Sequence, residues 1–319
     1  MSRTHPIPGG LNLALTAGVF AASLGLLGLG ERLGGLGLAA CALAFAVLGQ
    51  TNFALIHEAE HDKLHPRQGV NDAAGVLLSA LFPGSFTVLK AAHLMHHRRN
   101  RSDAELIDFY RPGERWAKTL KYYTLISGAI WVGSPLVSVA LCFVPGRWFR
   151  PDPGRAKGTD LTTFLSFLEG VNPWRIRAEV ALTVGLWAAV IPMLSLSWTT
   201  LALVYATFAF FWASQQYVYH VRTPLHLVEG SFDLRMPRWL GWLWLHFNYH
   251  LTHHRTVSVP WLYLPEVAQE QPWRPYLRTW LTSWRPPRPV LAAWPERFVA
   301  RGPLPAPAPP EFSGPPSPG

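Results

Sequence analysis

The 319-residue sequence predicts an all-α integral membrane protein with four transmembrane helices, additional re-entrant or interfacial helices, and a cytoplasmic histidine-rich cap. Two observations lead to this fold class. Hydrophobic residues make up 49% of the chain and charged residues only 15%, against about 25% charged residues in a soluble protein. The apolar residues gather in long runs, and most histidines gather at the ends of these runs or between them. Together they indicate a membrane-embedded body with a polar, histidine-rich end.

Four apolar runs are the predicted transmembrane helices. Residues 11–29 and 35–56 are each long enough to cross a bilayer, which takes about 20 residues. The first run could be a signal peptide, but a second span follows at once and no convincing cleavage site precedes it. Residues 178–196 and 199–213 form a second pair, joined by a very short turn.

Two further apolar runs are interrupted. Residues 73–91 contain Pro83 and Gly84 near their centre, and residues 122–145 contain Pro135. Proline and glycine break a helical pattern. The run 73–91 is therefore expected to be a re-entrant or interfacial segment rather than a span.

The basic residues predict the sidedness of the chain. Residues 95–121 and 146–177 are rich in Arg and Lys, and such loops lie on the cytoplasmic side. The run 122–145 between them then enters the membrane and returns, or lies in its interface. Both termini and all histidine clusters are expected on the cytoplasmic side. The prediction is one membrane domain, residues 1–285, with a cap built from 92–121, 146–177 and 214–285.

Composition also limits the kinds of partner and metal site that the chain is expected to have. The net charge of +9 could indicate nucleic-acid binding, but cytoplasmic Lys and Arg beside the spans explain it more simply, so no nucleic-acid partner is expected. Cys41 and Cys142 both fall in apolar runs, which argues against a disulfide framework or a cysteine-based zinc site. Residues 286–319 are proline-rich and predict a flexible tail, with a docking ligand as the alternative.

The motif HEAEH, residues 57–61, matches the H-E-x-x-H signature of zinc proteases. In such enzymes two histidines one helical turn apart hold the metal and the glutamate, here Glu58, acts as base. A membrane protease would also need a distant acidic ligand, and the sequence contains no LDG or NPDG segment to supply it. It would have no use for further clustered histidines, so the protease is the weaker interpretation.

The motif H-x-x-H-H occurs twice, as HLMHH at 93–97 and HLTHH at 250–254. Positions i, i+3 and i+4 share one face of a helix, so each motif is expected to present three imidazoles together. These imidazoles and the HEAEH pair are too many for one tetrahedral zinc and suit two metal ions. Imidazole fits iron, zinc, copper or nickel, so the spacing does not identify the metal. The eight candidate ligands are His57, His61, His93, His96, His97, His250, His253 and His254.

Two other kinds of metal protein are less consistent with this pattern. A ferritin-like di-iron bundle uses two E-x-x-H motifs, whereas the chain has one, from Glu58 to His61. A metal transporter would place histidines within the spans along a pathway, whereas these lie at span ends and in loops. The transporter is the non-enzymatic alternative.

Three histidine motifs in this order around four spans resemble the membrane fatty acid desaturase/hydroxylase superfamily. The stretch GSFDLRMPRWLGWLWLHFNYHLTHHRTVSVPWLYLP resembles bacterial fatty acid desaturases and, less closely, carotenoid ketolases. The resemblance covers about residues 35–265. It implies two iron ions in a di-iron site, O2 as oxidant, and a multi-pass location that is expected to be a bacterial inner membrane. It also implies a separate electron donor of ferredoxin or cytochrome b5 type.

The resemblance implies further site residues. One more histidine usually completes the ligand set before the third motif, and His220 in SQQYVYH holds that place. An amide four residues earlier contributes in some members, and Gln216 holds that position. Surface or core roles are the alternatives for both. His246 lies one turn before His250, where many relatives have Asn, so it is expected to support the site rather than bind metal.

Several side chains close to the motifs could support the ligands. His65 lies one turn beyond His61 on the same helical face, and it could reach the site, support a ligand or lie on the surface. Carboxylates commonly orient ligating imidazoles by accepting their other N–H. Asp62 and Asp103 are candidates for this role, and for Asp108 a solvated surface position is an equally good interpretation.

The implied reaction is the O2-dependent desaturation of a fatty acyl chain on a lipid or thioester. No catalytic side chain beyond the metal ligands is expected. Hydroxylation or ketolation of a lipid or carotenoid on the same di-iron site is the alternative. Trp187, Trp198, Trp212, Trp242 and Trp244, near span ends, could line a groove for the chain, although interfacial anchoring is the more common reason for such residues.

Overall fold

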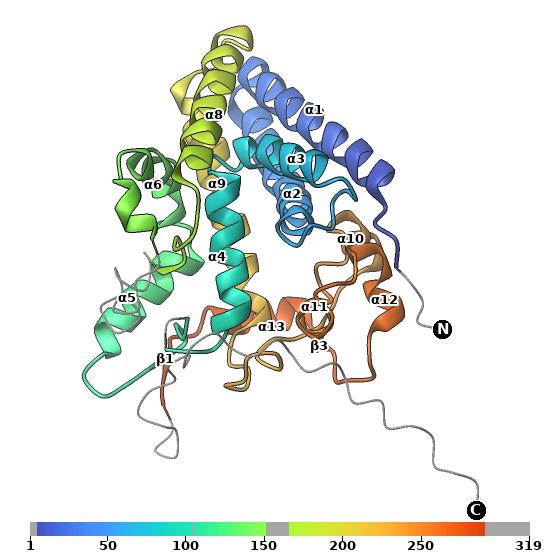
Figure 1. Ribbon diagram of the computed structural model, residues 1–319, viewed down its shortest axis with the longest axis vertical. Coiled ribbons are helices and arrows are strands. Elements are labelled where there is room, and N and C mark those ends of the chain that lie inside the picture. Colours follow the sequence, from blue (N-terminus) through green and yellow to red (C-terminus); the bar gives the residue numbers. More distant parts are fainter. Residues whose placement is uncertain (1–4, 104, 151–165, 291–319) are drawn as a thin grey trace, which may run out of the picture.

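The computed structural model describes residues 5–103, 105–150 and 166–290, and its regular structure is almost entirely helical, as predicted (Figure 1). Four long helices form the body: α1 (Gly9–Leu33), α2 (Gly35–Glu60), α8 (Pro173–Met193) and α9 (Trp198–Gln216). The part of the predicted tail beyond residue 290 and the middle of the predicted loop 146–177 lie outside the described residues.

Three of these helices, α1, α2 and α8, are long and apolar enough to cross a membrane. They correspond to the predicted runs 11–29, 35–56 and 178–196. The fourth predicted run, 199–213, does form α9, but among the described helices α9 does not reach the same hydropathy. Its Thr, Trp and Gln side chains lower the mean hydropathy of the helix, so the structure does not confirm four spans.

Tight packing of α9 against α2 explains why α9 is nevertheless central to the fold. The rings of Phe45 and Phe208 meet edge to face at 5.9 Å. A Cβ on Gly49 would lie 2.4 Å from the Phe208 ring, so a side chain there would push the two helices apart. Gly34, just before α2, has a φ of 59°. Glycine adopts this left-handed conformation without strain, and here it lets the chain reverse direction between α1 and α2.

The two interrupted runs form bent helix pairs. Helices α3 (Gln68–Leu81) and α4 (Phe86–Arg99) are bent by 99° at the Pro83–Gly84 break, and α5 (Arg115–Ile126) is bent by 64° from the segment Trp131–Cys142. That segment contains η1 (Trp131–Gly133) and α6 (Ser134–Cys142). Each pair is either a broken span or a re-entrant loop, so three to five crossings are possible.

The remaining elements are short, and those that follow α9 gather below α2 and α4 (Figure 1). The helices are η2 (Gly146–Phe149), η4 (Tyr217–Tyr219), α10 (Arg238–Leu243), α11 (His250–Arg255), η5 (Trp261–Tyr263), α12 (Leu264–Val267) and α13 (Tyr276–Ser283). The two-residue strands β1 (Phe109–Tyr110) and β4 (Arg288–Pro289) pair in parallel, as do β2 (Leu234–Arg235) and β3 (Arg274–Pro275). Strand β4 lies at the start of the predicted tail.

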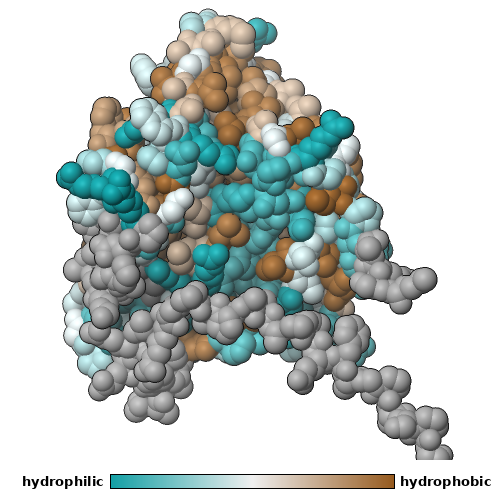
Figure 2. All heavy atoms as spheres, in the orientation of Figure 1, coloured by the Kyte–Doolittle hydropathy of each residue, from teal (hydrophilic) through white to brown (hydrophobic). Residues whose placement is uncertain are grey.

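Surface hydropathy separates the two ends of the molecule. In Figure 2 apolar side chains cover the end where α1 and α8 lie, and hydrophilic side chains cover much of the middle, around α4. Leu36 at the start of α2 and Leu182 on α8 are 90% and 64% exposed. Large apolar patches of this kind mark a membrane or protein contact, so the apolar end is suited to a bilayer and the histidine-bearing end to its surface.

Candidate metal centre

Five histidines from three elements converge in a first group, here called the five-histidine cluster. The donor nitrogens of all five lie within 4.8 Å of one another. The Nε2 atom of His93 lies 2.8 Å from that of His61 and 3.0 Å from that of His97, and the Nε2 atoms of His97 and His253 are 3.1 Å apart. The members are His57, His61, His93, His97 and His253.

The remaining four predicted ligands form the four-histidine cluster, His96, His220, His250 and His254. The Nε2 atom of His250 lies 2.9 Å from that of His220 and 3.3 Å from that of His254. The two clusters adjoin, because the ring centroids of His97 and His254 are only 4.4 Å apart. The structure thus brings together all nine histidines that the sequence singled out.

Each H-x-x-H-H motif is divided between the two clusters. In α4 the outer pair, His93 and His97, belongs to the five-histidine cluster, and His96 belongs to the other. In α11 the assignment is reversed, since His253 alone joins the five-histidine cluster. Helical geometry explains the division. Viewed down the helix axis, the side chain at i+4 points about 40° to one side of the side chain at i, and the side chain at i+3 points about 60° to the other side. The expectation that each motif acts as one face was therefore too simple.

The donor set fits two bound cations. Two imidazole nitrogens on adjacent sides of an ion, each about 2.1 Å from it, lie about 3 Å apart, close to the observed Nε2 separations. The Nε2 atom of His57 is buried and has no hydrogen-bond partner, which a metal would supply. Burial lowers the pKa of His61 to about 4 and that of His220 and His250 well below 6.5, so these rings are neutral and their lone pairs are available.

Hydrogen bonds at the opposite ring nitrogen orient several of these imidazoles. Nδ1 of His96 lies 2.5 Å from a carboxylate oxygen of Glu105, and Nδ1 of His220 lies 2.9 Å from the carbonyl oxygen of Gly230. Each acceptor favours a proton on Nδ1 and leaves Nε2 free for a metal. Glu105 could not be recognised from the sequence, because it lies in a loop eight residues beyond His97 and belongs to no recognisable motif.

The predicted supporting residues have mixed placements. Gln216 lies beside the clusters, in the wall of a cavity that four of the histidines also line, and donates to Gln50. His246 is buried but directs Nδ1 at the carbonyl of Trp261, and Nδ1 of His65 accepts from the backbone N–H of Arg67. His246 and His65 thus belong to neither cluster.

The acidic candidates near the motifs bind basic side chains. Asp62 accepts from Lys90 at 2.5 Å, and Asp103 accepts from Arg111 at 3.0 Å. Neither residue is a member of the two histidine clusters among the described residues. The role of orienting an imidazole falls to Glu105 instead.

The solvated interpretation of Asp108 is wrong, because this residue is 1% exposed. Its carboxylate accepts from the guanidinium of Arg101 at 2.8 Å, from the Tyr217 hydroxyl at 2.8 Å and from the Arg222 backbone N–H at 2.5 Å. A buried charge needs such partners. The network ties the loop after α4 to the segment that carries His220.

The third motif is held by two buried acidic groups. Asp233 accepts from the backbone N–H of Thr252 at 3.0 Å and from its hydroxyl at 2.5 Å, which caps the first turn of α11. Glu58 accepts from the backbone N–H of Trp261 at 3.2 Å, and the indole of Trp261 donates to Asn12 at 2.9 Å. Glu58 therefore anchors the loop after α11, a packing role quite different from that of a protease base.

A cavity of about 420 Å³ adjoins the histidines. Members of both clusters line it, namely His93, His96, His220 and His250, and so does the buried Glu60. Most of the remaining wall is apolar, with Leu89, Leu125, Ile126, Trp131, Phe53, Trp212 and Phe247 among the lining residues. A metal ion in either cluster would thus adjoin a cavity whose wall is mostly apolar but also includes Arg101, Glu105 and Lys121.

Comparison with known proteins agrees with this geometry. A family model for fatty acid desaturases matches residues 34–286, well over half of the chain. A comparison with curated proteins finds no match. The family match covers all three histidine motifs and His220, and it confirms the resemblance to the membrane fatty acid desaturase/hydroxylase superfamily. The chain therefore belongs to the fatty acid desaturase family.

Proposed function

We propose that this protein is an O2-dependent membrane di-iron oxidoreductase that desaturates a fatty acyl chain of a lipid or thioester. The observation that carries the proposal is the apolar cavity whose wall includes histidines of both clusters. An alkyl chain in this cavity would place unactivated C–H bonds beside the metal centre. The nine clustered histidines would be the ligands of the two iron ions.

Iron bound by these histidines would activate O2. In the balanced overall reaction, one O2, two hydrogens from neighbouring carbons, two electrons and two protons give an alkene and two waters. The contribution of the chain is placement. Leu89, Ile126 and Phe247 offer apolar surface to an alkyl chain. Glu105 and the Gly230 carbonyl hold His96 and His220 with Nε2 directed away from these acceptors.

The two electrons would come from a separate carrier of ferredoxin or cytochrome b5 type, on the cytoplasmic side. The exposed Arg98 directly follows the ligand His97 at the end of α4. A positive surface at this position would attract an acidic carrier through long-range electrostatics. The carrier would then dock on the histidine-bearing end of the molecule, where the path to the metal is short.

Metal analysis of detergent-purified protein, combined with lipid profiling of cells that overexpress it, tests the proposal. We expect about two irons per chain, one for each cluster, and new unsaturated acyl chains. Iron with hydroxylated or keto products would assign the alternative chemistry to the same site. A single zinc and no change in lipids would contradict both and favour a protease.

Substitution of a ligand separates the metal site from the rest of the fold. His96→Ala is expected to lose iron from the four-histidine cluster and to abolish product formation, while the protein remains in the membrane. His226→Ala is the matched control, because His226 lies outside both clusters and its Nδ1 accepts from the nearby backbone N–H groups of Val228 and Glu229. Iron content and product yield should be unchanged in this control, and loss of iron there would refute the ligand assignment.

A further inference from the structure

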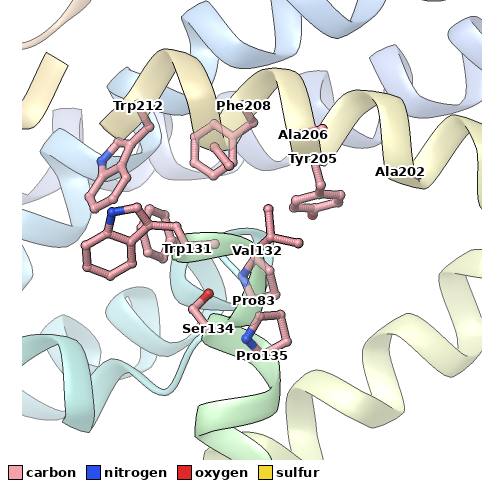
Figure 3. A pocket seen from close by; sticks show the side chains of 12 residues that line it. Pro83, Trp131, Val132, Ser134, Pro135, Ala202, Tyr205, Ala206, Phe208 and Trp212 are labelled. Atoms are coloured by element: carbon pink, nitrogen blue, oxygen red, sulfur yellow. The ribbon is translucent and has the colours of Figure 1, made fainter. Parts of the chain in front are cut away.

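A second apolar cavity adjoins the metal-lined one. It has a volume of about 290 Å³ and lies between α9 and the segment that begins at η1 (Figure 3). Tyr205 and Phe208 project from α9 toward Val132, Pro83 and Pro135 on the opposite side. This space, here called the α9 groove, is lined almost entirely by apolar side chains and contains no histidine.

Two tryptophans separate the α9 groove from the metal-lined cavity. In the part of the chain that the structure describes, both spaces share only Trp131 and Trp212 as lining residues. Their rings meet edge to face, with centroids 4.8 Å apart and planes at 89°, as Figure 3 also shows. The Nε1 atom of Trp212 is buried without a hydrogen-bond partner, so no polar contact of that indole fixes the pair.

The two tryptophans differ in how firmly they are held. Trp212 is 5% exposed and packs against Phe53 and Phe82, with ring centroids 5.0 and 4.8 Å away. Trp131 is only half-buried and lies on the short helix η1, at the bend between α5 and α6. A movement of the Trp131 ring would join the two spaces and leave the core around Trp212 intact.

The α9 groove opens toward surface that is suited to lipid. Val132 in its wall is 63% exposed, and Leu136 in the next turn is 74% exposed. Ala202 and Ala206 present small exposed side chains along α9. In a membrane protein such apolar surface is in contact with acyl chains, so an alkyl chain in this groove would remain in an apolar environment along its length.

We propose that the α9 groove is a second acyl subsite, which receives the part of the substrate chain that extends past the metal-lined cavity between Trp131 and Trp212. This inference rests on the proposed function, because the occupant is the acyl chain of the same substrate. The two spaces share the tryptophan wall, and both are lined mostly by apolar residues. An alkyl chain is the occupant that fits such a lining. The Trp131 ring then determines which chain lengths fit with the reacting carbons beside the histidines.

Photo-crosslinking tests the location of the chain without relying on turnover. The probe is a phospholipid whose acyl chain carries a diazirine near its terminal methyl group, mixed with metal-loaded protein in phosphatidylcholine vesicles. We expect crosslinks on the peptides that contain Pro135 and Ala206, and their loss in Ala206→Trp, which fills the groove. Crosslinks to Leu182, on the exposed face of α8, report ordinary lipid contact and should be equal in both proteins. Labelling at Pro135 that persists unchanged in Ala206→Trp would overturn the inference.

Chain-length selectivity gives an independent readout. When two substrates differ by one methylene group in an apolar pocket, the enzyme distinguishes them by about 10- to 200-fold. Ala206→Trp should therefore lower conversion of long chains relative to short ones by at least about tenfold, and Trp131→Ala should shift conversion toward longer chains. Trp239→Ala is the control, since Trp239 is 68% exposed and lines neither space.

The two proposals can fail separately. If no acyl product forms from any chain but the groove peptides are labelled in the expected pattern, the desaturase function is wrong and the subsite stands. If products form with the same chain-length profile in wild type, Trp131→Ala and Ala206→Trp, the desaturase function stands and the subsite is wrong.

Discussion

At the residue scale, the hydrogen bond at Nδ1 would control how well each clustered histidine serves as a metal ligand through Nε2. The sequence shows which imidazoles are clustered, but it cannot show what each Nδ1 contacts, because the acceptors come from loops. Glu105 and the Gly230 carbonyl are examples, lying nine and ten residues from the histidines they contact. The side chains chosen by proximity in sequence, Asp62 and Asp103, bind Lys90 and Arg111 instead.

Replacement of Glu105 tests this control. Glu105→Gln removes the charge that faces Nδ1 of His96 while nearly preserving the shape of the side chain. Loss of such an orienting partner typically costs 10- to 100-fold in metal affinity, so we expect about that change in iron retention against a chelator. Glu266→Gln, at an exposed position on α12, should behave like wild type. Equal iron retention in the two variants would show that His96 is oriented by other contacts.

At the element scale, the bend between α3 and α4 brings three histidines, His93, His96 and His97, to the two clusters. The sequence predicted the interruption at Pro83 and Gly84, but not the direction of the bend, because that depends on a distant helix. The carboxylate of Glu179 on α8 accepts from Ser85 Oγ at 2.5 Å, from the Thr87 backbone N–H at 2.9 Å and from Thr87 Oγ1 at 2.6 Å. The negative charge of Glu179 beside the first turn of α4 also interacts favourably with the dipole of that helix.

Glu179→Gln is expected to weaken this joint. The amide keeps the shape of the side chain but removes the negative charge from all three hydrogen bonds, and hydrogen bonds to charged groups contribute about 1.5–3 kcal/mol each. We expect a decrease in unfolding free energy of about that size in detergent, together with weaker iron binding, because α4 carries His93, His96 and His97. The exposed Glu270 supplies the control Glu270→Gln. Unchanged stability in Glu179→Gln would mean that packing alone holds α4.

At the scale of the whole molecule, the two clusters combine motifs that are far apart in sequence. The sequence predicted the fold class, three of the helices that can span a membrane and the nine histidines. It could not predict that α4 and α11 contribute to the clusters in opposite ways, because the answer depends on how these helices face each other. It also could not reveal the tryptophan wall, since Trp131 and Trp212 belong to separate apolar runs.

Buried neutral histidines make the metal-free protein sensitive to acid. The folded state keeps His61 neutral down to about pH 4, whereas an unfolded chain protonates histidine near pH 6.5. Between these values the unfolded state binds more protons, so the unfolding free energy falls as pH decreases. The unfolding temperature of chelator-treated protein should therefore fall from about pH 7 to about pH 5, and less steeply in His61→Gln. A rise over that range would contradict the buried, neutral state.

The contacts of Trp261 have a consequence for biosynthesis. This residue joins Asn12 in the first long helix and Glu58 beside the first motif to the loop that follows the third motif. During translation, Asn12 and Glu58 are synthesised some two hundred residues or more before Trp261. The five-histidine cluster cannot be complete before residue 253 has been synthesised, and the four-histidine cluster cannot be complete before residue 254. Any metal that needs the complete clusters would therefore be captured late, after the long helices have been synthesised.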